Sequence, residues 1–170
     1  LEPNSKYFPC PFSNLTISNP DAPLRSVSYD GLAKLGIQII ETRAIAVGAA
    51  QKTVRLSGGT ALPFDRLIMS PGVDFIWGAI EGYDWRAVQS MPHGWKAGEQ
   101  TRLLQARLKA MPDGGIFAIT IPPPPFRCPP GPYERASLIA GYLKTHKPKS
   151  KLLLLDAQDN FSKQSLFEQA

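Results

Sequence analysis

Two helical patterns and two apolar runs alternate in the second half of the chain. Apolar residues spaced three and four positions apart predict helices over residues 99–111 and 133–145. Continuous apolar runs predict buried strands over residues 115–121 and 151–155. A strand, a helix and a second strand in this order form a βαβ unit, in which the two strands pair in parallel.

The first half of the chain has short β-branched runs separated by turn residues. Strands are expected at residues 37–40, 44–49, 53–56, 61–64 and 67–70. The two strands that begin at residues 44 and 53 are predicted to pair antiparallel, and the third closes a small meander. This pattern indicates an antiparallel flap beside a parallel sheet.

The remaining segments carry weaker signals. A short helix is predicted near residues 28–36, with Leu32 and Leu35 facing inward and Gly36 as its C-terminal stop. Residues 1–23 are polar and interrupted by prolines, which favours an ordered loop with about one turn of helix.

Composition excludes several classes of protein. With 43% hydrophobic and 19% charged residues, the 170-residue chain can bury a core, and no apolar run approaches the roughly 20 residues that span a bilayer. The net charge of +5 permits an acidic partner. The basic residues are scattered and no recognition motif accompanies them, so nucleic-acid binding is not expected. No metal site is predicted.

The most unusual stretch is the loop at residues 121–137, where seven prolines surround Cys128. Prolines stiffen the loop, and loops at the carboxyl end of a strand are where α/β proteins place chemistry. Arg127, Arg135 and the following helix N-terminus favour a thiolate at Cys128, which indicates redox or nucleophilic chemistry. A buried, inert thiol is the alternative reading.

Glu134 and Cys10 are further candidates. Glu134 is either a general acid or base near Cys128, or a carboxylate favoured by the helix dipole. Cys10 lies between two prolines, and two cysteines are too few for a disulfide framework. They could pair with each other, or each could have a separate role or none.

Two observations concern dinucleotides. Glu2 follows what could be the end of a strand, where a dinucleotide-binding unit holds a ribose hydroxyl, although on position alone a solvated terminal residue is the better interpretation. The strand at 115–121 is followed by prolines rather than by a Gly-rich turn, so this βαβ unit is not expected to bind NAD in the usual way.

Four segments of the chain resemble the flavoprotein subunit of flavocytochrome c sulfide dehydrogenase. They are residues 7–14, 91–100, 125–137 and 161–165. The resemblance implies an α/β, FAD/NAD(P)-binding fold (Rossmann-like, three-layer) with a small antiparallel β-meander. It further implies a partial FAD-binding domain over 1–75, a linker or crossover over 76–97, and a partial second Rossmann-like domain over 98–170.

The resemblance also implies roles for individual residues. Cys10 would carry the thioether to the 8α-methyl group of the flavin, and Cys128 would be one of two redox cysteines near the flavin ring. The other implied contacts with FAD are Glu2 on the adenosine ribose, backbone at Arg43 and Ala44 on the adenine, and Ser70, Pro71 and Gly72 along the dinucleotide site.

The implied activity is sulfide oxidation. Sulfide would attack a disulfide or persulfide at the cysteine pair, and the electrons would pass to covalently bound FAD and then singly to a cytochrome c subunit that carries the haem. The family implies a bacterial periplasmic location, although no signal peptide is visible. The alternatives are a sulfide:quinone reductase-type flavoprotein and a non-catalytic redox-partner module of the same fold.

We expect this chain to be an internal part of a longer protein. The Gly-rich turn for the FAD pyrophosphate and the partner of Cys128 are expected outside residues 1–170. We therefore expect the chain alone to bind FAD weakly or not at all and to be inactive.

Overall fold

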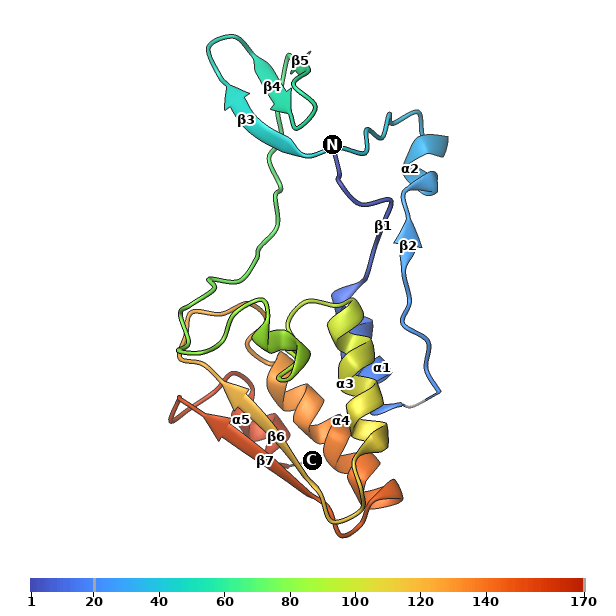
Figure 1. The fold of residues 1–170 in the computed structure, drawn as a ribbon, viewed down its shortest axis with the longest axis vertical. Helices are drawn as coiled ribbons and strands as arrows, with labels where there is room; N and C mark the ends of the chain where they lie inside the picture. Colours follow the sequence, from blue (N-terminus) through green and yellow to red (C-terminus); the bar gives the residue numbers. More distant parts are fainter. Residues whose placement is uncertain (20, 170) are drawn as a thin grey trace. The chain divides into compact units, whose positions relative to one another are not determined.

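A computed structural model describes residues 1–19 and 21–169 and divides the chain into two compact units (Figure 1). The first unit comprises Leu1–Tyr7 and Ser26–Trp77, and the second comprises Phe8–Arg25 and Gly78–Ala170. Helices, small antiparallel sheets and a parallel pair confirm the α/β class. The units differ from the predicted domains in placing residues 8–25 with the later half of the chain. Their assignment as FAD-binding and second Rossmann-like domains stays a prediction.

The second unit is built around the predicted βαβ element. Strands β6 (Ile116–Ile121) and β7 (Lys151–Asp156) pair in parallel, in a register that sets Ile116 opposite Lys151 and Ile121 opposite Asp156. Helix α4 (Gly131–His146) connects them, and Figure 1 shows the two strands side by side. The parallel pairing and the long connecting helix confirm the βαβ prediction.

The core of the second unit lies where three helices and β6 meet. Helix α1 (Ser13–Ser18) packs against both α3 (Glu99–Ala110) and α4. Ile17 of α1, Leu108 of α3 and Ile139 of α4 are each at most 1% exposed. Burial of such aliphatic side chains contributes about 1.5–3 kcal/mol each, so these contacts hold residues 8–25 in this unit.

Hydrogen bonds reinforce the contact between α1 and α3. The side-chain amide of Gln105 donates to the carbonyl oxygens of Thr16 at 2.8 Å and Asn19 at 2.7 Å. Thr16 lies in the last turn of α1, where carbonyl groups lack helical partners, and Asn19 is the residue that follows the helix. Gln105 therefore satisfies the end of α1 and ties it to α3.

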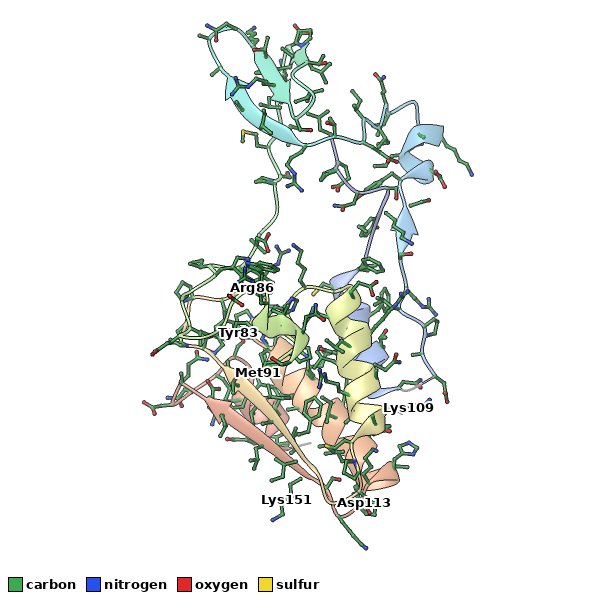
Figure 2. All side chains as sticks on the ribbon, in the orientation of Figure 1. Tyr83, Arg86, Met91, Lys109, Asp113 and Lys151 are labelled. Carbon is green, nitrogen blue, oxygen red and sulfur yellow. The ribbon has the colours of Figure 1, made fainter. Side chains whose placement is uncertain are left out.

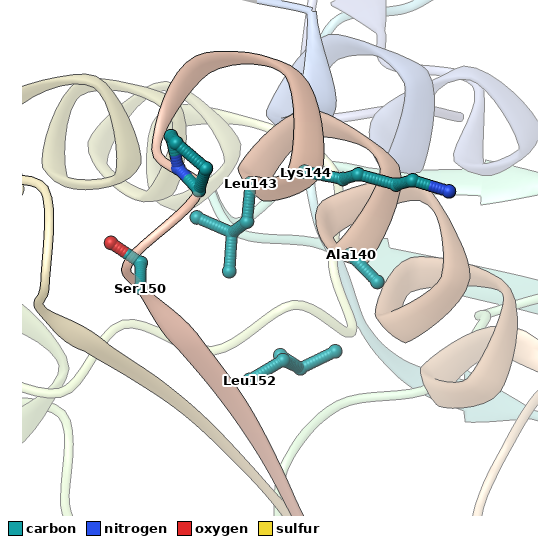
Figure 3. A pocket seen from close by; sticks show the side chains of 6 residues that line it. Ala140, Leu143, Lys144, Ser150 and Leu152 are labelled. Atoms are coloured by element: carbon teal, nitrogen blue, oxygen red, sulfur yellow. The ribbon is translucent and has the colours of Figure 1, made fainter.

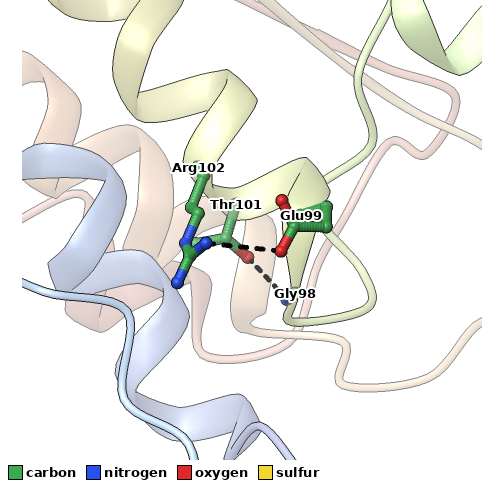
Figure 4. A network of polar contacts seen from close by, with 4 residues as sticks. All are labelled: Gly98, Glu99, Thr101 and Arg102. Carbon is green, nitrogen blue, oxygen red and sulfur yellow. Dashed lines mark hydrogen bonds and ion pairs between the residues drawn. The ribbon is translucent and has the colours of Figure 1, made fainter.

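The start of α3 is fixed by local polar contacts (Figure 4). The hydroxyl of Thr101 accepts a hydrogen bond from the backbone N–H of Gly98 at 3.2 Å, and Arg102 pairs with Glu99 at 3.5 Å. Gly98 has a φ of +149°, in the region that favours glycine. The helix begins where the sequence predicts it, with a glycine as its N-cap.

Strand β7 differs from its prediction, because it is not fully buried. Leu153, Leu154 and Leu155 are all exposed, Leu155 by 56%. Within residues 1–19 and 21–169, β7 pairs only with β6, so one edge of the strand has no neighbour. A continuous apolar run is typical of a strand inside a larger parallel sheet. The prediction that residues 151–155 are fully buried rested on that pattern and is wrong.

Aromatic packing closes the carboxyl end of the strand pair. The ring of Tyr133 stacks on Phe161 with centroids 3.7 Å apart, and its hydroxyl donates a hydrogen bond to the carboxylate of Asp156. Helix α5 (Gln164–Phe167) adds Phe167 to this cluster. The end of β7 is thereby attached to the first turn of α4.

The segment between residues 78 and 98 is irregular, with one short 3-10 helix, η2 (Ala87–Gln89). The hydroxyl of Tyr83 donates to the carbonyl oxygen of Met91 at 3.0 Å, and Figure 2 labels both residues. Arg107 of α3 donates to the carbonyl oxygen of Gln89 at 2.7 Å. These contacts attach the segment to the helical core.

The first unit contains the predicted meander. Strands β3 (Ala44–Gly48), β4 (Thr53–Leu56) and β5 (Ala61–Pro63) pair antiparallel in that order. A two-stranded sheet joins β1 (Lys6–Tyr7) and β2 (Val27–Ser28). The short helix α2 (Asp30–Lys34) ends before Gly36, whose φ of +80° suits a helix stop.

Three predictions for the first unit are wrong. Residues 37–40 and 67–70 are not strands. The side chain of Ile68 is 90% exposed and that of Leu35 is 77% exposed, and Leu32 is exposed as well. Apolar runs become strands only where a neighbouring strand pairs with them, and none does so for these runs in the part of the chain that the structure describes.

No helix among the described residues is both long and apolar enough to cross a membrane.

The bond between Tyr133 and Asp156 generates a prediction about stability. Tyr133→Phe is expected to lower the free energy of unfolding by about 1–3 kcal/mol, because a hydrogen bond to a charged group is lost. Burial and the bond to Asp156 raise the pKa of the Tyr133 hydroxyl above its ordinary value of 10.0. The wild-type contribution is therefore fully present below about pH 10 and is lost as the pH rises further.

Urea unfolding at several pH values between 7 and 11 measures both effects. Tyr142→Phe is the control, because its buried ring lies on the same helix and its hydroxyl has no hydrogen-bond partner among residues 1–19 and 21–169. Equal losses of stability in the two variants would contradict the role of the Tyr133 hydroxyl.

Candidate functional site

Cys10 and Cys128, far apart in the sequence, line the same cavity of about 230 Å³ in the second unit. Both thiols are exposed and free, so the disulfide that the sequence left open is not formed. Asn14, Glu134 and Arg135 share this cavity. The packing of α1 against α3 and α4 is what brings the two thiols together.

Cys10 begins the 3-10 helix η1 (Cys10–Phe12), which leads directly into α1. The hydroxyl of Ser13 donates to the carbonyl oxygen of Cys10 at 2.8 Å. The hydroxyl of Thr16 donates to the carbonyl oxygen of Phe12 at 3.1 Å. The backbone around Cys10 is thereby fixed, whereas its sulfur remains accessible for covalent chemistry.

Cys128 lies in the turn that precedes α4, with a φ of +58°. Its carbonyl oxygen accepts a hydrogen bond from the N–H of Gly131 at 2.9 Å. A Cβ atom at position 131 would lie 3.2 Å from the sulfur of Cys128, a distance that requires the thiol to shift. Glycine at 131 therefore lets the thiol lie against the start of α4, where the N-terminal end of the helix dipole favours negative charge.

Asn14 connects the two thiol-bearing segments. Its side-chain amide nitrogen donates to Glu134 Oε2 at 2.7 Å and to the carbonyl oxygen of Gly131 at 3.3 Å. Both partners are acceptors, so the orientation of the amide is determined. This contact holds the carboxylate of Glu134 beside the cavity, and its role as a general acid or base stays a prediction.

Arg135 is the buried cation of the cavity, with 7% of its surface exposed. Its guanidinium lies flat against Gly94 and donates to the carbonyl oxygen of that residue. A Cβ atom at position 94 would lie 2.4 Å from the guanidinium carbon. Burial lowers the pKa of Arg135, and negative charge on Cys10, Glu134 and Cys128 opposes that shift.

Sequence reasoning missed Asn14 and Gly94. Asn14 is four residues beyond Cys10, but nothing in the sequence pairs it with Glu134. Gly94 lies in an irregular segment, where a glycine usually indicates only a turn. Their roles follow from tertiary packing alone.

The other predicted cofactor-binding residues lie in the first unit. The carboxylate of Glu2 accepts hydrogen bonds from the backbone and the side chain of Asn4, and the backbone bond is the main reason that its pKa is lowered. Arg43 accepts a backbone bond from Ser57, and Ala44 begins β3. Ser70, Pro71 and Gly72 are exposed. The roles of these residues toward FAD stay predictions.

A second cavity, of about 260 Å³, lies between α4 and β7 (Figure 3). Its lining is mostly apolar, and Lys144 is the only ionisable group among the lining residues. The cavity contains no thiol or carboxylate, so it lacks the groups that redox or acid–base chemistry requires. Among the described residues no group of three or more His, Cys, Asp and Glu side chains could hold a metal ion.

The Asn14 contacts generate a second prediction. Asn14→Leu keeps nearly the same side-chain shape but removes both donors, which leaves the carbonyl of Gly131 and the carboxylate of Glu134 without them. We expect the free energy of unfolding to fall by about 1–3 kcal/mol.

Chemical denaturation measures the change. Asn160→Leu is the matched control, since Asn160 is exposed, its side chain makes no hydrogen bond among residues 1–19 and 21–169, and the substitution should change stability by at most about 0.5 kcal/mol. If both variants lose the same stability, Asn14 does not connect the two segments.

A comparison with known protein families supports the resemblance. Residues 101–170 match the family described as the central part of the sulfide dehydrogenase (flavocytochrome c) flavoprotein chain. The matched residues include α3, β6, the Cys128 turn, α4, β7 and α5. The match supports a flavin-containing oxidoreductase, and the family's name pairs the flavoprotein chain with a cytochrome c. Residues 101–170 of this chain are therefore similar to the central part of flavocytochrome c sulfide dehydrogenase flavoprotein chains.

Proposed function

We propose that this chain is part of a flavoprotein that oxidises sulfide at Cys128, with FAD attached through Cys10. The observation that carries the proposal is the shared cavity of the two thiols, with the carboxylate of Glu134 beside them. One cysteine alone would fit many roles. Two exposed thiols that converge from distant parts of the sequence fit a cofactor anchor and a reacting sulfur at one site.

The residues present fit a covalently bound flavin. The sulfur of Cys10 is exposed beside the cavity, so a thioether could form without disturbing the core. The carboxylate of Glu2, in the first unit, is an acceptor of the kind that ribose hydroxyls require, and its role toward the adenosine ribose is part of the proposal. Bound FAD would accept an electron pair and release the electrons singly.

Cys128 would hold the sulfur atom of the substrate. Joining hydrosulfide to a thiolate as a persulfide forms one S–S bond and releases one proton and two electrons. Bound FAD would supply the oxidant for this electron pair. Glu134 is oriented by Asn14 to receive the proton, which is the role expected of a carboxylate beside a reacting thiol.

The electrons would leave through a cytochrome c subunit that carries the haem. The family's name supports this acceptor, and a cytochrome c partner is consistent with the proposed periplasmic location. A quinone acceptor and a non-catalytic role are the competing readings. With a quinone acceptor, turnover would not require added cytochrome c. With a non-catalytic role, there would be no turnover that depends on Cys128.

Substitution of the two cysteines separates their roles. In the holoprotein, Cys128→Ser is expected to lower sulfide-dependent reduction of cytochrome c by about 10³-fold or more, because the hydroxyl is a far weaker nucleophile toward sulfur. The flavin stays covalently attached. Cys10→Ser is expected to remove the covalent flavin from the intact mass.

Steady-state kinetics and the mass of the denatured protein measure these outcomes. Unchanged turnover in Cys128→Ser would remove that residue from the reaction. A flavin still covalently bound in Cys10→Ser would place the attachment elsewhere. Turnover with a quinone and none with cytochrome c would favour the quinone-linked reading.

A further inference from the structure

Arg135 is a buried cation without a carboxylate partner. Its side chain is 7% exposed, and no ion pair joins it to an Asp or Glu among residues 1–19 and 21–169. The neighbouring Glu134 carboxylate interacts favourably with the Arg135 charge but forms no ion pair with it, and its hydrogen bond comes from Asn14. A buried charge is costly unless an opposite charge compensates it, so this guanidinium needs a negative group nearby.

The guanidinium is also incompletely hydrogen-bonded. One terminal nitrogen donates to the carbonyl oxygen of Gly94, whereas Nε is buried and has no partner in the described part of the chain. Gly94 allows the planar group to lie against the backbone, because any Cβ there would clash with it. The guanidinium is therefore fixed in position, and its Nε–H is an unused hydrogen-bond donor.

The cavity that Arg135 lines contains Cys10 and Cys128, and Cys128 is the group there that stays free to carry anionic sulfur when Cys10 holds the flavin. Cys10 and Cys128 both interact favourably with the Arg135 charge when they are negative. Arg127 is adjacent to Cys128 in the sequence but exposed, so solvent screens the effect of its charge on the thiol.

We propose that Arg135 makes this cavity a subsite for anionic sulfur, pairing with a protein thiolate or with free hydrosulfide. The subsite deepens the proposed function, since sulfide oxidation requires a sulfur anion beside Cys128. The existence of the subsite does not depend on the flavin, so it can be tested on the chain itself.

The first test compares two alkylating reagents that differ in charge. Iodoacetate is an anion and iodoacetamide is neutral, and peptide mass spectrometry gives the rate of each at Cys128. The ratio of the two rates reports the local positive charge and is independent of thiol accessibility. One cation close to the reacting sulfur is expected to change the ratio by up to about tenfold.

We expect the iodoacetate-to-iodoacetamide ratio to fall about fivefold to tenfold in Arg135→Gln and to stay near the wild-type value in Arg135→Lys. Arg127→Gln is the matched control and should change the ratio by less than about twofold, since its charge is exposed. An unchanged ratio in Arg135→Gln, or an equal fall in Arg127→Gln, would overturn the proposal.

A measurement on the wild-type chain tests the proposal even if the Arg135 variants do not fold. The ratio in the folded wild-type chain should exceed the ratio in urea by a similar factor, because unfolding removes the buried cation from Cys128. Equal ratios in buffer and in urea would overturn the subsite without any substitution.

The second test uses the holoprotein and identifies the source of the anion. If Arg135 binds free hydrosulfide, Arg135→Gln raises KM for sulfide and largely preserves kcat. If Arg135 stabilises a protein thiolate, kcat falls and KM changes little. If kcat and KM of Arg135→Gln equal those of the wild type, Arg135 neither binds free hydrosulfide nor stabilises a protein thiolate. If the iodoacetate-to-iodoacetamide ratio depends on Arg135 as expected but the holoprotein does not oxidise sulfide, the proposed function is wrong and the anion subsite stands.

Discussion

The packing of α1 against α3 and α4 is the contact on which the candidate site depends. It buries Ile17 against the helical core and carries Cys10 to the cavity that Cys128 also lines. Asn14, on the same helix, then hydrogen-bonds across to Glu134. Without this packing, the two thiols would belong to independent segments, and neither the cofactor anchor nor the reacting sulfur would have a defined neighbour.

The cavity combines rigid backbone with a buried positive charge that forms no ion pair among the described residues. The turn at Cys128 is closed by Gly131, and η1 is held by Ser13, so both sulfurs are attached to fixed backbone. Arg135 is held just as firmly against Gly94. A preorganised cation beside two thiols favours reactions in which negative charge gathers on sulfur, and that chemistry connects the family match to the geometry of this chain.

Local patterns predicted most of the helices and strands but few of the contacts. Helical periodicity located α3 and α4, and the proline-rich loop at Cys128 was recognised by its composition. The exposure of Leu155 and Ile68 was not predictable, because a local apolar run does not reveal whether a neighbouring strand exists. Asn14 escaped prediction for the same reason, since its partner Glu134 lies far away in the sequence.

The central claim is that Cys10 and Cys128 face one cavity in the folded chain, and a short bifunctional thiol reagent tests it most directly. Cross-linked peptides containing both cysteines are identified by mass spectrometry, with the folded chain and the urea-unfolded chain treated in parallel. The account predicts a Cys10–Cys128 cross-link that forms much faster in the folded chain than in urea. Rapid modification of each thiol separately, with no cross-link in the folded chain, would contradict it.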